Sequence, residues 1–145
     1  MNASKVERAL ALYLEQCWKP SYLTRIILVY IRLLPLFKGI LPQKVLSVLL
    51  EREKQLRGKP FDCSEFENLR EIVRAELNRR IGDGDQSTKE AMLNRLVFCA
   101  LLDDDETDVF YLTEPISEFA RVMAVSPVEL QRIIESEFVG FRVDA

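Results

Sequence analysis

Residues 22–34 read YLTRIILVYIRLL, and this run indicates the fold class. Only one threonine and two arginines interrupt its apolar and aromatic side chains, so a helix of this sequence has almost no polar face. Such a helix belongs in the interior of a helical protein. Pro35 ends or kinks it. Arg25 and Arg32 are seven residues apart and therefore share the one edge that we expect to face water or a partner.

The sequence on both sides of this run repeats the helical pattern. Apolar residues recur there with a period of 3.6, which predicts an all-α protein of about seven helices. We expect the helices at 22–34 and 65–81 to form its centre. Four segments open with a serine that a glutamate follows three positions later, a pair that caps a first turn. These pairs are Ser4 and Glu7, Ser64 and Glu67, Ser87 and Glu90, and Ser126 and Glu129. The expected helices are 5–18, 22–34, 42–57, 65–81, 88–102, 115–123 and 127–137.

The composition limits the chemistry that is open to the chain. Hydrophobic residues make up 48% of its 145 residues and charged residues 30%, as in a compact globular protein. There is no histidine, which excludes Ser-His-Asp and Cys-His nucleophiles and histidine zinc sites. There is also no CxxC and no glycine-rich phosphate loop. We therefore assign no catalytic residue, no metal ligand and no cofactor, and we expect a protein that is not an enzyme.

The cysteines and the apolar segments indicate a cytoplasmic protein. Cys17, Cys63 and Cys99 are odd in number and far apart, so we expect reduced and mostly buried thiols. The N-terminus lacks the pattern of a secretory signal. The most apolar stretch, residues 22–37, is too short and too charged to span a membrane.

Charge is distributed unevenly along the chain. Residues 1–81 contain 15 Lys or Arg and nine Asp or Glu, whereas residues 82–145 contain five and 14. Residues 82–86, Gly-Asp-Gly-Asp-Gln, have the composition of a linker. We therefore expect a basic N-terminal helical lobe, 1–81, and an acidic C-terminal lobe, 87–145, either separate or in one continuous domain. The split indicates faces with different partners, halves that attract each other, or solvated charges without a partner.

The C-terminal half predicts two short helices, 115–123 and 127–137, joined by a tight turn. The runs 109–112 and 139–143 favour β-structure and predict two short strands that pair. With this order of elements, residues 88–145 resemble the winged-helix superfamily of helix-turn-helix proteins, although Ala124 replaces the usual turn glycine and the wing is truncated. The residues that carry the resemblance are Ala120, Met123, Ala124, Val125, Leu130 and Ile133.

The resemblance implies that the helix at 127–137 is a recognition helix. Its charged residues are three glutamates and one arginine, and such a surface repels DNA phosphates. We therefore expect a winged helix that binds protein. DNA reading through Gln131 and Arg132 is the less favoured alternative.

Residues 103–108, Asp-Asp-Asp-Glu-Thr-Asp, form the densest run of one charge in the chain. Such a run creates a strong local field that steers a basic partner. The run also aligns with a calcium-binding EF-hand loop that ends at Glu114, but Asp108 stands where that loop needs glycine. A solvated acidic turn is the third interpretation.

These features predict a non-catalytic binding protein of the immunity, antitoxin, anti-activator or adaptor type. Its acidic C-terminal surface would dock onto a basic protein partner such as a nuclease or toxin domain. The alternatives are a helix-turn-helix transcriptional regulator that binds DNA and a helical enzyme or metal-responsive protein. No membrane partner is expected, and a homodimer is compatible with the pattern. The predicted partner-binding residues are Asp103, Asp104, Asp105, Glu106, Asp108, Glu129, Arg132, Glu135 and Glu137, with Arg25 and Arg32 as a secondary surface.

Overall fold

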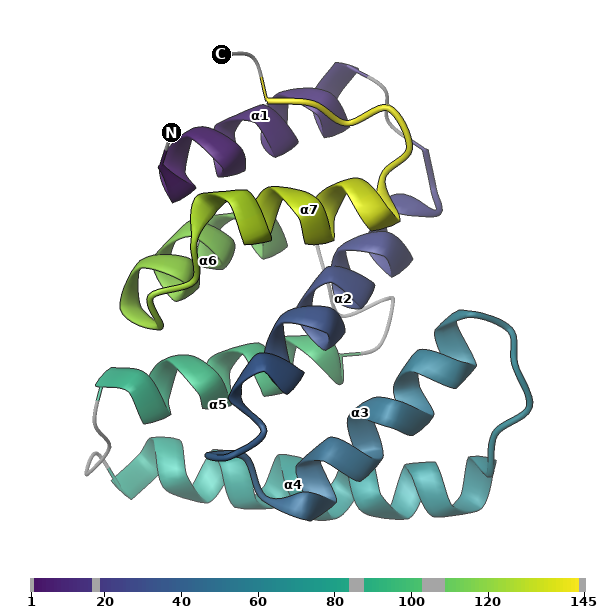
Figure 1. The fold of residues 1–145 in the computed structure, drawn as a ribbon. Coiled ribbons are helices and arrows are strands. Elements are labelled where there is room, and N and C mark those ends of the chain that lie inside the picture. The colour runs from purple at the N-terminus through teal and green to yellow at the C-terminus, as the bar shows by residue number, and fades with distance from the viewer. Residues whose placement is uncertain (1, 17–18, 84–87, 103–108, 144–145) are drawn as a thin grey trace. The chain divides into compact units, whose positions relative to one another are not determined.

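The computed structural model describes residues 2–16, 19–83, 88–102 and 109–143. These residues form seven α-helices and one short 3-10 helix, and none of them belongs to a strand (Figure 1). The prediction of an all-α protein with about seven helices is confirmed. No helix in this part of the chain combines the length with the hydropathy that crossing a bilayer requires. The elements are α1 (Ala3–Gln16), α2 (Tyr22–Leu33), η1 (Leu34–Phe37, the 3-10 helix), α3 (Gln43–Leu56), α4 (Cys63–Asp83), α5 (Thr88–Ala100), α6 (Val109–Val122) and α7 (Pro127–Glu137).

Helix α2 is buried in the way that its sequence predicts. Every residue from Ile26 to Ile31 is buried. Such a consecutive run passes through more than one helical turn, so the helix is covered all round rather than on one face. The α-helix ends at Leu33, and η1 follows with Pro35 in its first turn.

The helix starts follow the predicted capping chemistry only in part. Ser126 caps α7, because its side chain accepts a hydrogen bond from the backbone N–H of Glu129 (3.1 Å). In α1 and α4 the side chains of Asn2 and Asp62 cap instead, each accepting from the N–H three residues ahead (2.9 and 3.0 Å). Asn and Asp are as effective as Ser at this position, so both helices begin two residues earlier than predicted. The predicted cap at Ser87 lies outside the described residues.

The chain forms two compact units that differ from the predicted lobes. The terminal unit combines Met1–Val29 with Asp103–Ala145, and the middle unit is Tyr30–Leu102. The expected boundary at 82–86 therefore falls within the span of the middle unit. The difference arises because α1 packs against α6 and α7 from the other end of the sequence. The terminal unit contains seven Lys or Arg and 13 Asp or Glu, so it keeps the acidic surplus.

Helices α1, α6 and α7 contribute to the core of the terminal unit, which also includes residues 22–29 of α2. Helix α1 packs along α6 and against α7, and each helix buries one apolar stripe. The hydroxyl of Ser117 on α6 donates a hydrogen bond to the carboxylate of Glu7 on α1 (2.6 Å) and links these two helices. The buried residues of the three stripes are Val6, Leu10, Leu14, Ile116, Phe119, Ala120, Met123, Leu130, Ile133 and Ile134.

The predicted pair of short strands is wrong. Residues 109–112, which have a β-favouring composition, form the first turn of α6. Ile116, Phe119, Ala120 and Met123 recur at helical spacing and are buried, and this helical period outweighs the local β preference. Pro115 consequently lies inside α6 instead of starting a helix.

Aromatic packing holds the other predicted strand, residues 139–143, in a non-strand conformation. The hydroxyl of Tyr13 donates a hydrogen bond to the carbonyl of Val139 (2.7 Å). The rings of Phe138 and Phe141 meet the Tyr13 ring edge-on at centroid distances of 6.1 and 6.0 Å. Between them, Gly140 has a φ of +86°, a left-handed conformation that interrupts an extended backbone.

The turn between α6 and α7 contains one residue in an unfavourable conformation. The N–H of Val125 donates to the carbonyl of Ala120 (2.9 Å), as in a Schellman motif at a helix C-terminus. Ala124, between these elements, has a φ of +57°. The left-handed region is unfavourable for a residue with a Cβ by about 1–2 kcal/mol.

We expect Ala124→Gly to raise the free energy of unfolding by about 0.5–1 kcal/mol, because relief of the left-handed strain exceeds the added entropy of the unfolded chain. Ala75→Gly is the matched control. Ala75 is exposed in the interior of α4, and glycine there should lower the same quantity by about 1 kcal/mol. Urea denaturation measures both variants. An equal loss of unfolding free energy in Ala124→Gly and Ala75→Gly would contradict a left-handed conformation at Ala124.

The middle unit is built on α4, which packs against α3 and α5. Two charged residues of α4, Arg74 and Glu76, interact with side chains of the neighbouring helices. Lys44 of α3 forms an ion pair with Glu76, and the hydrogen bond from this lysine lowers the pKa of Glu76. The guanidinium of Arg74 lies over the ring of Phe98 at 5.5 Å. The buried apolar residues of α3, α4 and α5 are Val45, Val48, Leu49, Phe66, Val73, Leu77, Met92, Leu93, Leu96, Val97 and Ala100.

The two described cysteines have different surroundings. Cys63, the first residue of α4, is exposed, whereas Cys99 in α5 is partly buried. Burial raises the pKa of the Cys99 thiol. The prediction of mostly buried thiols is therefore wrong for Cys63, which lies outside the apolar stripe of its helix. Cys17 lies outside the described residues.

We expect iodoacetamide to alkylate Cys63 about tenfold or more faster than Cys99 at mildly alkaline pH, because only the thiolate reacts and burial keeps Cys99 protonated. The measurement is peptide mass spectrometry on a Cys17→Ser variant. Unfolding in urea is the control, because it should make the two rates similar. Faster alkylation of Cys99 than of Cys63 in the folded protein would contradict the exposed position of Cys63 and the partial burial of Cys99.

Candidate functional site

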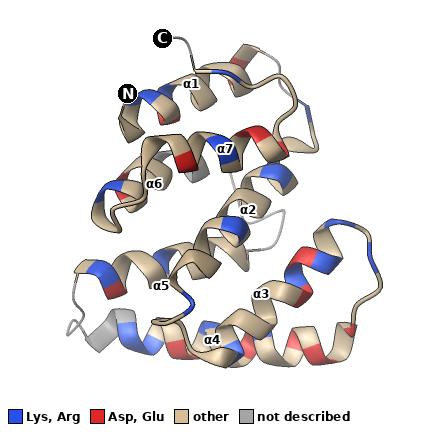
Figure 2. Ribbon diagram, in the orientation of Figure 1, with Lys and Arg blue, Asp and Glu red and all other residues tan. Residues whose placement is uncertain are grey.

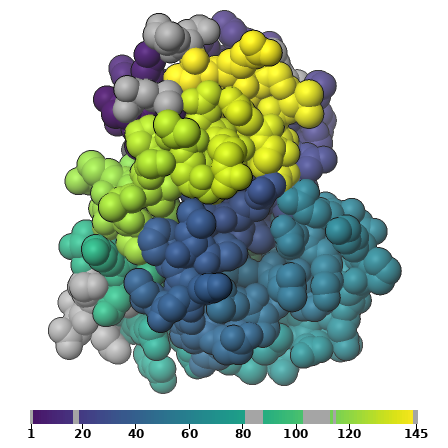
Figure 3. Space-filling model, viewed as in Figure 1, coloured from purple at the N-terminus to yellow at the C-terminus, as the bar shows by residue number. Residues whose placement is uncertain are grey.

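The outward side of α7, with Glu129, Arg132 and Glu135, carries the described part of the predicted partner surface. Figure 2 shows the acidic and basic positions along this helix, and Figure 3 shows α7 at the molecular surface. Arg132 donates two hydrogen bonds to the carboxylate of Glu129 (3.0 and 2.5 Å), and Gln131 donates one to Glu135 (2.8 Å). These pairs hold four side chains in place on consecutive turns of one helix. Val128 begins the same surface and is 69% exposed. The outward side therefore presents an apolar side chain next to pre-arranged charged groups.

Glu137 is not part of this surface, and its prediction as an exposed partner-binding residue is wrong. Its side chain is 1% exposed and accepts a hydrogen bond from Arg25 of α2 (3.2 Å). The reason is helical spacing. Glu137 follows Leu130 by seven residues and Ile133 by four, so it lies on the buried stripe of α7. That spacing is visible in the sequence and identifies a carboxylate that needs a partner cation.

The predicted acidic residues Asp103, Asp104, Asp105, Glu106 and Asp108 lie outside the described residues. The calcium-loop interpretation depends on the same run. Across the described part of the chain, no group of three acidic, cysteine or histidine side chains is arranged to hold a metal ion. The described candidate surface is therefore the outward side of α7.

Arg25 and Arg32 have different roles although one edge of α2 carries both. Arg25 belongs to the terminal unit and pairs with Glu137. Arg32 belongs to the middle unit, where it lines a mostly apolar groove of about 470 Å³ beside η1 and α3. The residues that line this groove are Ile31, Arg32, Pro35, Lys38, Gln43, Leu46, Ser47, Leu49, Leu50 and Glu53.

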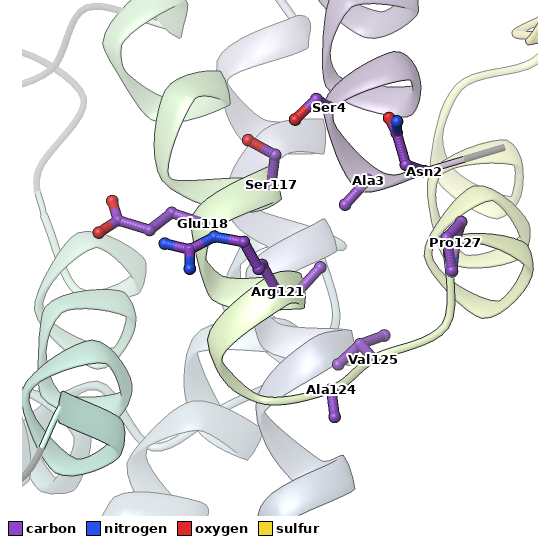
Figure 4. Close-up of a pocket in the computed structure, with 10 residues that line it drawn as sticks. Asn2, Ala3, Ser4, Ser117, Glu118, Arg121, Ala124, Val125 and Pro127 are labelled. Carbon is purple, nitrogen blue, oxygen red and sulfur yellow. The ribbon is translucent and has the colours of Figure 1, made fainter.

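A pocket of about 590 Å³ in the terminal unit lies between the start of α1, α6 and the turn to α7 (Figure 4). Its polar side chains are those of Asn2, Ser4, Ser117, Glu118 and Arg121. A serine nucleophile needs a base that is held against it, and this chain has no histidine. Ser117 instead donates to Glu7, which connects two helices. We assign this pocket no catalytic role.

Sequence reasoning missed a basic groove in the terminal unit. Lys5 and Arg8 of α1 and Arg142 near the C-terminus line a space of about 450 Å³. The α1 part has a visible signal, because Lys5, Arg8 and Leu12 recur at helical spacing on one side of the helix. Arg142 has no such signal, since only folding brings the two ends of the chain together.

Comparison with models of protein families, with curated proteins and with solved structures finds no match for this chain.

Proposed function

We propose that the protein is a non-catalytic binding protein that recognises a basic protein partner through the acidic terminal unit. The outward side of α7, with Glu129, Arg132 and Glu135, forms the described part of the contact surface. A nuclease or toxin domain fits the expected partner chemistry. Immunity proteins, antitoxins, anti-activators and adaptors are the corresponding biological roles.

The observation that carries this proposal is the hydrogen-bonded arrangement of the α7 side chains. Because Glu129 and Glu135 are already held by Arg132 and Gln131, little side-chain entropy is lost when a partner binds. Val128 supplies exposed apolar area beside them. The excess of acidic over basic residues in this unit adds long-range attraction for a cationic partner.

The test uses the full chain and the double variant Glu129→Lys, Glu135→Lys as baits in a lysate of the source cells. The control variant Glu15→Lys, Glu71→Lys makes the same change in net charge at exposed positions on α1 and α4. We expect the wild type and the control to capture a basic protein that the α7 variant loses. With the purified partner, the α7 variant should raise Kd about tenfold or more, and high salt should reduce the difference. Equal capture by the α7 variant would contradict the proposal.

A winged-helix-like DNA-binding protein is the second candidate, and the α6–α7 turn favours it. The left-handed residue Ala124 stands where helix-turn-helix proteins commonly have glycine, and α1 packs against both α6 and α7. Against it, Arg132 would have to leave Glu129 to reach a base or a phosphate. Binding to random duplex DNA that falls with salt and weakens in Arg132→Ala would favour this candidate over the first.

A further inference from the structure

The terminal unit has a second, oppositely charged surface on the exposed side of α1. The groove of about 450 Å³ runs between α1 and the C-terminal segment 140–143. Three of its lining residues are cationic and none is acidic. The lining residues are Lys5, Arg8, Ala9, Leu12, Tyr13, Gln16, Gly140, Arg142 and Val143.

The fold builds this groove by fixing the C-terminal segment beside α1. The Tyr13 hydroxyl holds the carbonyl of Val139 at 2.7 Å. Phe141 is buried, with its ring 6.0 Å from the Tyr13 ring. The left-handed Gly140 turns the chain between these two anchors. Arg142 follows directly, so its position next to α1 is set by the packing of its neighbours.

The cations of the groove differ from two other arginines of this unit. Arg25 and Arg132 are held by carboxylates. Among the described residues, Lys5, Arg8 and Arg142 form no ion pair. Glu135 lines an adjoining pocket on the far side of Arg142, also without an ion pair to it in this part of the chain. The groove therefore offers cationic groups that are open to an external anion.

Apolar side chains lie between these cations. Leu12 is 53% exposed, and Ala9 and Val143 line the groove next to it. An exposed leucine among cations favours a ligand that carries both acidic groups and an apolar side chain. From Lys5 to Gln16 the helix rises about 16 Å, which an extended peptide of about five residues spans.

We propose that this groove binds an acidic peptide segment of a partner protein, with an apolar side chain of the peptide covering Leu12. The carboxylates of the peptide pair with Lys5, Arg8 and Arg142. A peptide is favoured over a nucleic acid, because exposed Leu12 lies among the cations and a phosphate backbone offers no apolar side chain to cover it. This surface adjoins α7 at Arg142, which also lines a pocket with Gln131 and Glu135. It extends the function proposed above to a second class of partner.

The experiment titrates the full chain into a fluorescein-labelled peptide, acetyl-Glu-Asp-Leu-Asp-Glu-amide, at low salt and follows anisotropy. We expect saturable binding that weakens at least about tenfold in the double variant Arg8→Glu, Arg142→Glu. Arg121→Glu is the matched control. Arg121 is an exposed cation of the same unit outside the groove, and its reversal should change Kd less than about twofold. The variant Glu129→Lys, Glu135→Lys should keep peptide binding, so failure of the α7 proposal is distinguishable from failure of this one.

Two further measurements separate a peptide groove from general attraction of anions. Replacing the leucine of the peptide by serine should weaken binding about threefold or more, because burial against Leu12 is lost. In NMR spectra of labelled protein, peptide should shift the amide signals of residues 5–16 and 140–143. Absence of saturable binding, equal loss in Arg121→Glu, an unchanged Kd for the serine peptide, or tighter binding of duplex DNA at the same residues would each overturn the proposal.

Discussion

Replacing Arg52 by methionine is expected to lower the free energy of unfolding by about 3 kcal/mol. Arg52 is 4% exposed and lies in α3. Its guanidinium donates hydrogen bonds to the carbonyl of Ala100 (3.3 Å), the last residue of α5, and to that of Leu102 (2.7 Å) just after it. A third hydrogen bond goes to the side chain of Gln55 (2.7 Å). The last carbonyls of a helix have no partner within it. Methionine fills a similar volume but leaves these carbonyls without the arginine as donor.

The control for this prediction is Lys54→Met on the same helix. Lys54 forms a partly exposed ion pair with Glu51 (2.9 Å), and such pairs contribute about 0.5 kcal/mol or less. Urea denaturation monitored by circular dichroism measures both variants. In Arg52→Met, hydrogen exchange should also accelerate near the end of α5. A loss similar to that of Lys54→Met would show that the end of α5 does not depend on Arg52.

The second large effect concerns the ion pair between Arg25 and Glu137. We expect Arg25→Met to lower the free energy of unfolding by about 2–3 kcal/mol, because it leaves the buried carboxylate of Glu137 without this cation. The expected loss is below that of a fully buried pair, since the side chain of Arg25 is 43% exposed and water screens it.

The double variant Arg25→Met, Glu137→Met tests the cause of that loss. If the loss of this cation from the buried carboxylate is responsible, removing the carboxylate as well should restore about half or more of the lost stability, and the two substitutions will be non-additive. Urea denaturation of the wild type, both single variants and the double variant completes the thermodynamic cycle. Additive losses would contradict a direct interaction between the two side chains.

The candidate surfaces were predictable to different degrees. Glu129, Arg132 and Glu135 lie outward on α7 as their spacing from the apolar residues predicts. Glu137 is acidic like Glu129 and Glu135 and belongs to the same helix, three residues after Ile134. Its side chain is nevertheless buried. Net charge and local charge density do not distinguish these cases. The position of each glutamate relative to the apolar stripe of α7 distinguishes the exposed residues from the buried one.

The sequence by itself determined the helical class, the number of α-helices in the described residues and the cap of α7 by Ser126. These features depend on apolar periodicity and capping groups within a few residues of each other. Tertiary structure decided which segments form a unit, which carboxylate is buried and where the basic groove lies. Each of these depends on pairs from opposite ends of the chain, such as Tyr13 with Val139 and Arg25 with Glu137. No local pattern encodes such pairs, because they form only when the first 29 residues pack against the C-terminal part of the chain.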